Sequence, residues 1–139
     1  MAEKRIMKII FLDIDGVLNS RTYDRKRNRN EQTDIDESRL PLVKEIVDST
    51  GAEIVLSSTW RGHWDKAPEK CDEDGVYINN IFEKFGLKIF DKTPDLGMDF
   101  DRPDEVNAWL KATAEVIESF VIIDDYRYGW GKLFENFVK

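Results

Sequence analysis

Two pairs of aspartates are the residues of this chain best suited to chemistry. Asp13 and Asp15 end one unbroken apolar run, and Asp124 and Asp125 end another. In an extended chain, side chains two residues apart point the same way, so Asp13 and Asp15 face one small volume. Like charges held so close are unfavourable unless a cation or a shared proton neutralises them. The pattern therefore predicts a divalent cation, and four carboxylates suit Mg²⁺, a hard ion that binds carboxylates together with a substrate phosphate.

The elements that must position these acids are predicted to be parallel strands. Apolar runs at residues 9–12, 54–56 and 120–123 do not alternate with polar residues, which indicates strands covered on both faces. A shorter strand is predicted at residues 87–90. Residues 133–139 are predicted to form either a last strand, favoured at 135–138, or a short helix. We therefore expect an α/β fold, a Rossmann-like three-layer sandwich with a mainly parallel sheet of about five strands. Ligands of such sheets bind at the carboxyl ends of the strands.

Helices are predicted between these strands. The first is capped by Asp36 or Ser38 and ends at Gly51. Its buried stripe consists of Leu40, Val43, Ile46 and Val47. The second has apolar side chains at helical spacing within residues 78–85, and the third begins after Asp101, which is available as a cap. A helix between two strands of one sheet makes a parallel βαβ connection the expected arrangement.

Hydroxyl groups and an arginine follow the second strand. Ser57, Ser58 and Thr59 should lie at the same edge of the sheet as Asp13, because parallel strands end together. Taken alone, such a run is equally typical of a turn or a helix cap. Arg61 is a candidate phosphate-binding group, since a guanidinium matches the geometry of phosphate oxygens.

Two polar segments have less obvious roles. Residues 19–37 contain five basic side chains and almost no apolar ones, which predicts a basic flap. This flap is either a solvated excursion or an electrostatic lip that draws an anionic substrate toward the aspartates. Residues 72–75 repeat the Asp-x-Asp-Gly string of residues 13–16, but no apolar strand precedes them. We therefore interpret residues 72–75 as a surface turn.

Length and composition limit the class of protein. With 139 residues, of which 41% are hydrophobic and 35% charged, the chain should form a single domain over residues 1–139. We find no apolar window long enough to cross a bilayer and no signal peptide, so we expect a cytoplasmic protein without membrane contact. One cysteine, Cys71, and one histidine, His63, predict neither an internal disulfide nor a zinc site. A net charge of −7 argues against a general nucleic-acid coat.

Taken together, these stretches resemble the haloacid dehalogenase (HAD) superfamily of phosphotransferases, whose four motifs lie in order at the ends of parallel strands. Residues 13–17 match the first motif, Ser58 the second, Arg102 or Lys92 the basic third, and residues 124–125 the acidic fourth. The string Ser-Ser-Thr-Trp-Arg and the segment at 102–110 are similar to the HAD domains in Swiss Army Knife RNA repair proteins. The similarity to polynucleotide kinase-phosphatase is looser.

The resemblance implies a role for each of these residues. Asp13 would attack phosphorus and form an aspartyl-phosphate. Asp15 would protonate the leaving oxygen and then deprotonate the hydrolytic water. Ser58 would hydrogen-bond a phosphoryl oxygen, and Arg102 or Lys92 would offset charge on the transferring group.

The resemblance also implies a metal and a class of substrate. Mg²⁺ would be held by Asp13, the backbone carbonyl of Asp15 and Asp125, with Asp124 orienting the basic side chain or a metal-bound water. Contacts with the substrate are expected from Gly16, Thr59 and Arg61. The segments at residues 19–37 and 62–77 are too short to form a substantial cap domain over the site. The site should therefore be open to a phosphorylated macromolecule such as a polynucleotide end. A nucleotide or phosphoprotein phosphatase, a phosphotransferase with another acceptor and a non-enzymatic phosphate-binding module are the alternatives.

Overall fold

The computed structural model describes residues 6–14, 17–18, 35–113, 115–124 and 136–138, with only the backbone for residues 59, 137 and 138. The strands are β1 (Ile6–Leu12), β2 (Glu53–Leu56), β3 (Ile89–Lys92), β4 (Val116–Ile123) and β5 (Phe137–Val138). The α-helices are α2 (Leu40–Thr50), α3 (Glu73–Lys84) and α4 (Arg102–Ala112). Short 3-10 turns are η1 (Glu37–Arg39), η2 (Thr59–Gly62) and η3 (Pro68–Lys70).

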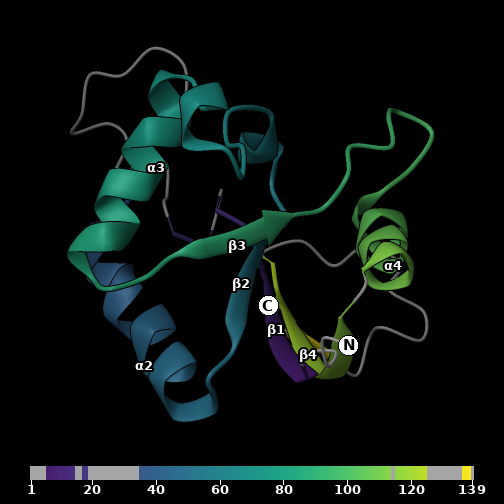
Figure 1. The fold of residues 1–139 in the computed structure, drawn as a ribbon, viewed down its shortest axis with the longest axis horizontal. Helices are drawn as coiled ribbons and strands as arrows, with labels where there is room; N and C mark the ends of the chain where they lie inside the picture. Colours follow the sequence, from purple (N-terminus) through teal and green to yellow (C-terminus); the bar gives the residue numbers. More distant parts are fainter. Residues whose placement is uncertain (1–5, 15–16, 19–34, 114, 125–135, 139) are drawn as a thin grey trace, which may run out of the picture.

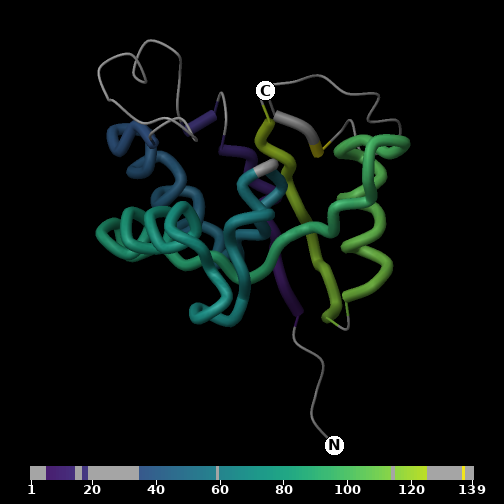
Figure 2. Tube along the Cα trace, turned by 90° about the horizontal axis from the view of Figure 1, so that it is seen from above, coloured from purple at the N-terminus to yellow at the C-terminus, as the bar shows by residue number. Residues whose placement is uncertain are grey.

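The strands form one sheet in the order β3-β2-β1-β4-β5, and every neighbouring pair is parallel. Helices α2 and α3 lie on one side of the sheet and α4 lies on the other, which makes three layers (Figure 1). Figure 2, turned by 90°, also shows α2 and α3 on one side of the strands and α4 on the other. The predicted Rossmann-like α/β fold is therefore confirmed, and β1 is the central strand.

Side chains along β1 alternate between the two apolar layers. Ile10 and Leu12 belong to the core beneath α2 and α3, whereas Ile9 and Phe11 pack with Val106 and other residues beneath α4. All four strand residues are at most 1% exposed, as expected for a strand covered on both faces. Because side chains of a strand alternate with a period of two, Asp13, which follows Leu12, is expected on the same face as Phe11, the side of α4.

The ends of helix α2 follow the prediction in part. Its Pro41 lies in the first turn, and Gly51 ends it with a φ of 72°, a left-handed conformation that favours glycine. The predicted cap, Asp36, caps the turn η1, and the N-cap of α2 is Arg39, which makes no side-chain cap.

The buried stripe of α2 is narrower than the sequence indicates. Leu40 and Val43 are buried, but Ile46 is 36% exposed and Val47 is half-buried.

The interpretation of residues 72–75 as a surface turn is wrong. Asp72 is the N-cap of α3, and its carboxylate accepts hydrogen bonds from the backbone N–H groups of Asp74 and Gly75. Asp74 and Gly75 are buried. A Cβ atom at Gly75 would lie 2.1 Å from the carbonyl oxygen of His63, so the glycine permits a close approach between two segments. The repeated string thus begins a helix and does not end a strand.

Strands β1, β3 and β4 differ from their predicted bounds, and β1 begins at Ile6, before the apolar run at residues 9–12. Leu87 is buried but precedes β3, because its N–H donates to the carbonyl of Phe82 and closes the end of α3. Strand β4 begins at Val116, well before the predicted apolar run at residues 120–123. This early part is largely exposed, and its backbone pairing with Ile6 and Met7 holds it as a strand. Of the described helices, none has the length and apolarity needed to span a membrane.

Candidate active site

The parallel hydrogen-bond ladder continues one residue beyond the carboxyl ends of the strands. The N–H of Asp13 donates to the carbonyl of Ile123 at 3.0 Å. The N–H of Ser57 donates to Leu12 at 2.9 Å, and that of Thr93 to Leu56 at 3.0 Å. Asp124, which follows Ile123, extends this row on the other side of Asp13. The sheet thus places two carboxylates and two hydroxyls along one edge, where ligands of such sheets bind.

Arg102 joins the two described acids of this edge. Its Nη1 lies 3.3 Å from Oδ1 of Asp13 and 3.1 Å from Oδ2 of Asp124, and it also donates to the carbonyl oxygen of Ser57. Asp13 and Asp124 are 5% and 1% exposed, and Arg102 is 9% exposed. Burial of these carboxylates is tolerable because the guanidinium compensates their charge. The structure therefore brings together Asp13, Arg102 and Asp124, the residues predicted for the first, third and fourth motifs.

The start of α4 explains how Arg102 reaches this position. Asp101 caps the helix, and Asp101 and Asp104 form a reciprocal capping box. Pro103 occupies the first turn, where its missing N–H is harmless. Arg102 is therefore the first residue of a helix whose beginning is held at the carboxyl edge of the sheet.

The donor set at this edge fits Mg²⁺. Asp13 and Asp124 provide carboxylate oxygens and Ser57 provides a hydroxyl oxygen, the hard ligands that Mg²⁺ prefers. The nitrogen and sulfur ligands that a softer ion would favour do not occur at this edge among the described residues. The remaining predicted ligands, Asp15 and Asp125, lie outside the described residues.

Several other predicted positions also lie outside the description. Gly16 and most of the predicted basic flap, residues 19–34, are outside the described residues, as is the side chain of Thr59. Their expected contacts with substrate stay predictions. Residues 35–37 at the end of the predicted flap are described, and Asp36 caps the turn that leads into α2.

Ser58 and Ser57 have different surroundings. The hydroxyl of Ser58, the residue predicted for the second motif, accepts from the N–H of Trp60 at 3.2 Å and caps η2. Ser57, directly beside Asp13 in the ladder, is 1% exposed, and its Oγ has no hydrogen-bond partner among the residues that the structure describes. A buried hydroxyl without a partner is rare, and one explanation is a ligand that completes its hydrogen bonding. Ser57, in addition to Ser58, is therefore a candidate to donate a hydrogen bond to a phosphoryl oxygen.

Replacing each serine with alanine should separate these two roles. We expect Ser57→Ala to lower kcat/KM about 10²-fold, the scale for loss of one donor to a transition-state oxygen, with an unchanged or slightly raised free energy of unfolding. We expect Ser58→Ala to lower the free energy of unfolding by about 0.5–2 kcal/mol, because it removes a cap. Phosphate-release kinetics and urea unfolding of both variants measure this. Equal activity of Ser57→Ala and the unmodified chain would contradict the assignment.

Lys92, the second candidate for the basic third motif, lies elsewhere. Its Nζ donates to the carbonyl oxygens of Arg61 at 2.9 Å and Trp64 at 2.7 Å. The structure therefore brings Arg102, and not Lys92, to Asp13. Any direct role of Lys92 in catalysis stays a prediction.

Arg61 is held by an acid that the sequence analysis did not single out. Its Nη2 lies 2.7 Å from Oε2 of Glu105, and the pair is buried, with side chains 12% and 5% exposed. The same oxygen of Glu105 accepts from the N–H of Leu96. Glu105 thus ties the turn after β2 and the loop before α4 to the first turns of α4. Its position on α4, three residues after Arg102, indicates that Glu105 lies near the site. Its partner Arg61 could not be predicted, because it is distant in the sequence.

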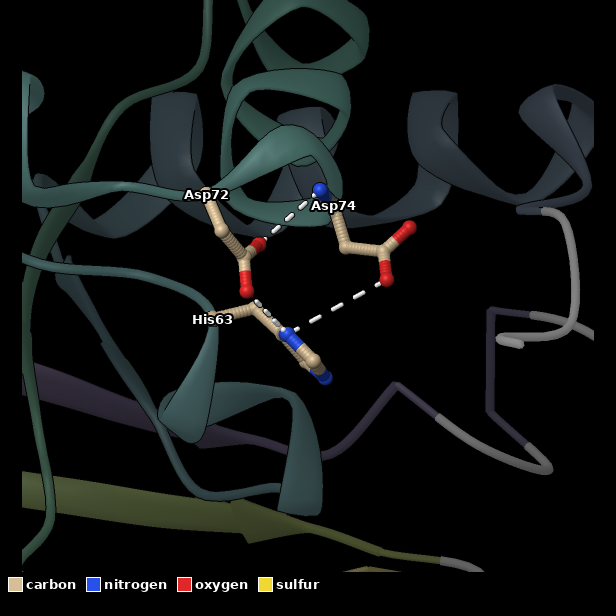
Figure 3. A group of neighbouring side chains, drawn as sticks. All are labelled: His63, Asp72 and Asp74. Carbon is tan, nitrogen blue, oxygen red and sulfur yellow. Dashed lines mark hydrogen bonds and ion pairs between the residues drawn. The ribbon is translucent and has the colours of Figure 1, made fainter.

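A separate group of possible metal ligands consists of His63, Asp72 and Asp74 (Figure 3). Their ligand atoms all lie within 4.8 Å of one another. His63 Nδ1 lies 2.5 Å from Oδ2 of Asp72 and 4.0 Å from Oδ2 of Asp74. This group was not predicted, because His63 is the one histidine of the sequence and residues 72–75 were interpreted as a surface turn. Packing of the two segments brings them together. The short contact with His63 fits a hydrogen bond that orients the N-cap of α3.

The hydrogen bond with His63 lowers the pKa of Asp72 below its ordinary value, with further lowering from the backbone N–H of Gly75. A depressed pKa in the folded state stabilises the fold at pH values above the ordinary pKa, and this stabilisation is lost as pH falls through the folded value. We expect Asp72→Asn, which keeps a good cap, to be less stable than the unmodified chain near pH 7. The difference in free energy of unfolding should shrink in strong acid.

Urea unfolding between about pH 2 and pH 7 measures this difference. A His63→Asn background provides the control, because the effect of Asp72→Asn should be much smaller without the imidazole. A difference that is constant with pH would contradict the role of this carboxylate.

One family model matches this chain. It is described as the HAD domain in Swiss Army Knife RNA repair proteins, and it matches residues 9–139, a range that includes Asp13, Ser57, Arg102 and Asp124. The curated proteins and the solved structures gave no match. The match extends from the central strand to the last residue, and the parallel α/β sheet is consistent with it. The chain therefore belongs to the family of HAD domains found in Swiss Army Knife RNA repair proteins.

Proposed function

We propose that this chain is a Mg²⁺-dependent phosphomonoester hydrolase that works through an aspartyl-phosphate on Asp13. Its family places it among HAD-type hydrolases. The observation that carries the proposal is the contact of the buried Asp13 with Arg102, which also contacts Asp124 at the carboxyl edge of the sheet. A nucleophilic carboxylate there has a cation beside it to compensate the charge of an incoming phosphate.

The reaction has two steps on this chain's own residues. A carboxylate oxygen of Asp13 attacks phosphorus, the bond from phosphorus to the ester oxygen breaks, and Asp15 transfers its proton to the leaving oxygen. Asp15 then removes a proton from water, whose oxygen attacks the phosphorus of the aspartyl-phosphate. The bond to Asp13 breaks, and inorganic phosphate and the free carboxylate result.

The surrounding groups hold the phosphoryl oxygens during both steps. The Ser57 hydroxyl donates to one of them, and Arg102 offsets their negative charge. Asp124 keeps Arg102 in place through its contact at 3.1 Å. Asp13 and Asp124, with the predicted Asp15 and Asp125, would hold Mg²⁺, which when bound reduces the repulsion between a carboxylate nucleophile and an anionic phosphate.

The proposed substrate is a phosphate at the end of a nucleic acid. The description of the matching family names RNA repair proteins, and the predicted basic flap at residues 19–37 is suited to a polyanion. This basic segment, which follows Asp15 closely in the sequence, would also offset the repulsion of a polyanion by the overall net charge of −7. An aqueous, cytoplasmic setting is the proposed location of this activity.

Phosphate release from a panel of substrates tests the proposal. The panel contains 3′- and 5′-phosphorylated oligonucleotides, mononucleotides, a sugar phosphate, a phosphopeptide and an aryl phosphate, each with Mg²⁺ or with EDTA. We expect turnover only with Mg²⁺, and the highest kcat/KM for one of the oligonucleotides. Turnover that is unaffected by EDTA would contradict the metal dependence, and preference for the phosphopeptide would contradict the substrate class.

A further inference from the structure

A pocket lies beside the candidate active site, at the end of β3. It has a volume of about 240 Å³ and is lined by Arg61, Gly62, Lys92, Thr93, Pro94 and Asp95. Thr93 follows Ser57 in the ladder, and Ser57 follows Asp13, so the pocket begins about two strand spacings, roughly 9.5 Å, from the proposed nucleophile. The volume is below the about 300–1,000 Å³ of pockets that enclose whole ligands, so this one suits a single group of a larger substrate.

The pocket contains hydrogen-bond donors that remain available. Three buried side-chain atoms lack a hydrogen-bond partner within the described ranges, and two of them, Arg61 Nε and Thr93 Oγ1, belong to residues that line this pocket. The third is Ser57 Oγ, the neighbour of Thr93. Lys92 Nζ makes two hydrogen bonds and has three N–H groups, so one donor remains. All three groups can donate, and two of them, the guanidinium and the ammonium, can only donate, which favours an anion.

Charge points the same way. The positive charge of Arg61 is compensated by the buried Glu105, whereas Lys92 donates only to neutral carbonyls and pairs with no carboxylate in the part of the chain that the structure describes. Asp95 is the one acid that lines the pocket, and its Oδ1 lies 3.5 Å from Arg61 Nη2 with the side chain 74% exposed. An exposed carboxylate at that distance is a weak partner that an incoming anion can displace.

The loop that follows the pocket favours a nucleotide over a peptide. Residues 93–101 connect β3 to α4, and this loop exposes Met98 completely and Phe100 to 54%. An exposed aromatic ring close in sequence to an anion pocket matches the combination of phosphate binding and base stacking used for single-stranded nucleic acids.

We propose that this pocket binds the second phosphate of a nucleotide substrate, the phosphodiester next to the phosphate that is removed, through Lys92, Thr93 and Arg61. This inference rests on the proposed function for its substrate, and it gives Lys92 a role in binding in place of catalysis. A single sugar separates the two phosphates of such a substrate, and Asp13 and the pocket lie along the same edge of the sheet, so one phosphate can lie at Asp13 with its neighbour toward the pocket. Asp95 competes with the second phosphate for Arg61.

Direct binding tests the pocket without relying on turnover. Titration calorimetry on the Asp13→Asn variant compares a nucleoside 3′,5′-bisphosphate with the two corresponding monophosphates. We expect the bisphosphate to bind at least about tenfold more tightly than either monophosphate, because the second phosphate gains charge-assisted hydrogen bonds. Lys92→Met and Thr93→Val, added singly to Asp13→Asn, should each reduce this ratio about three- to tenfold or more. Asp95→Asn should raise it, since the competing carboxylate is gone.

The opposite directions of Thr93→Val and Asp95→Asn make the outcome clear, because general damage to the fold cannot tighten binding. Equal affinity for the bisphosphate and a monophosphate, or a ratio that none of the three variants changes, would overturn the proposal. Tighter binding of an acidic phosphopeptide than of the bisphosphate would overturn it as well. Phosphate release by the unmodified chain is measured in parallel, so that loss of the proposed function and loss of the pocket's role are read separately.

Discussion

Asp13→Asn should abolish phosphate release, lowering kcat by at least about 10⁴-fold, because an amide cannot act as the nucleophile. Asp13 is 5% exposed and lies 3.3 Å from Arg102, so the variant keeps the surroundings of the site and loses the nucleophilic oxygen. Steady-state phosphate release from an aryl phosphate measures the loss. Labelling with a ³²P-phosphorylated substrate followed by acid quench should trap phosphate on the unmodified chain and none on the variant.

The matched control is Asp99→Asn, which changes an exposed aspartate of the loop before α4 in the same way. Circular dichroism of both variants should match that of the unmodified chain. Turnover by Asp13→Asn within tenfold of the unmodified chain would falsify the covalent mechanism.

Arg102→Met should have the largest effect on stability together with a strong effect on catalysis. The guanidinium contacts two buried carboxylates and a carbonyl oxygen, so its removal leaves Asp13 and Asp124 without this compensation. Breaking such a buried pair lowers the free energy of unfolding by about 3–5 kcal/mol. Loss of a cation at the transferring phosphate lowers kcat by about 10²–10³-fold. Urea unfolding and phosphate release measure the two effects.

Added Mg²⁺ should recover part of the stability that Arg102→Met loses, because a divalent cation binds the folded acidic edge and not the unfolded chain. We expect the stabilisation by Mg²⁺ to be greater for Arg102→Met than for the unmodified chain. Lys111→Met, at the exposed end of the same helix, is the control for a lost positive charge. If Lys92→Met lowered kcat as much as Arg102→Met on an aryl phosphate, the third-motif role would belong to Lys92.

Much of the fold could be predicted because its central strands, β1 and β2, are largely buried on both faces. The apolar runs before Asp13 and Asp124 do not alternate, and such runs occur in parallel sheets. Helix starts were predictable where a cap, a proline and acidic residues occur together, as before α4. The string at residues 72–75 was misinterpreted because a helix N-cap and a turn use the same residues, and the packing of Gly75 against His63 is a long-range contact.

The sequence alone determined where the carboxylates lie. Asp13 and Asp124 end apolar runs typical of parallel strands, and a parallel sheet brings the ends of its strands to one edge. Only the tertiary structure decided which cation joins them, because Arg102 and Lys92 both carry a positive charge and differ in what they contact. It also distinguished Ser57 from Ser58 and paired Arg61 with Glu105. The physical reason is that strand periodicity is a local property, whereas the reach of a side chain depends on how separate elements pack.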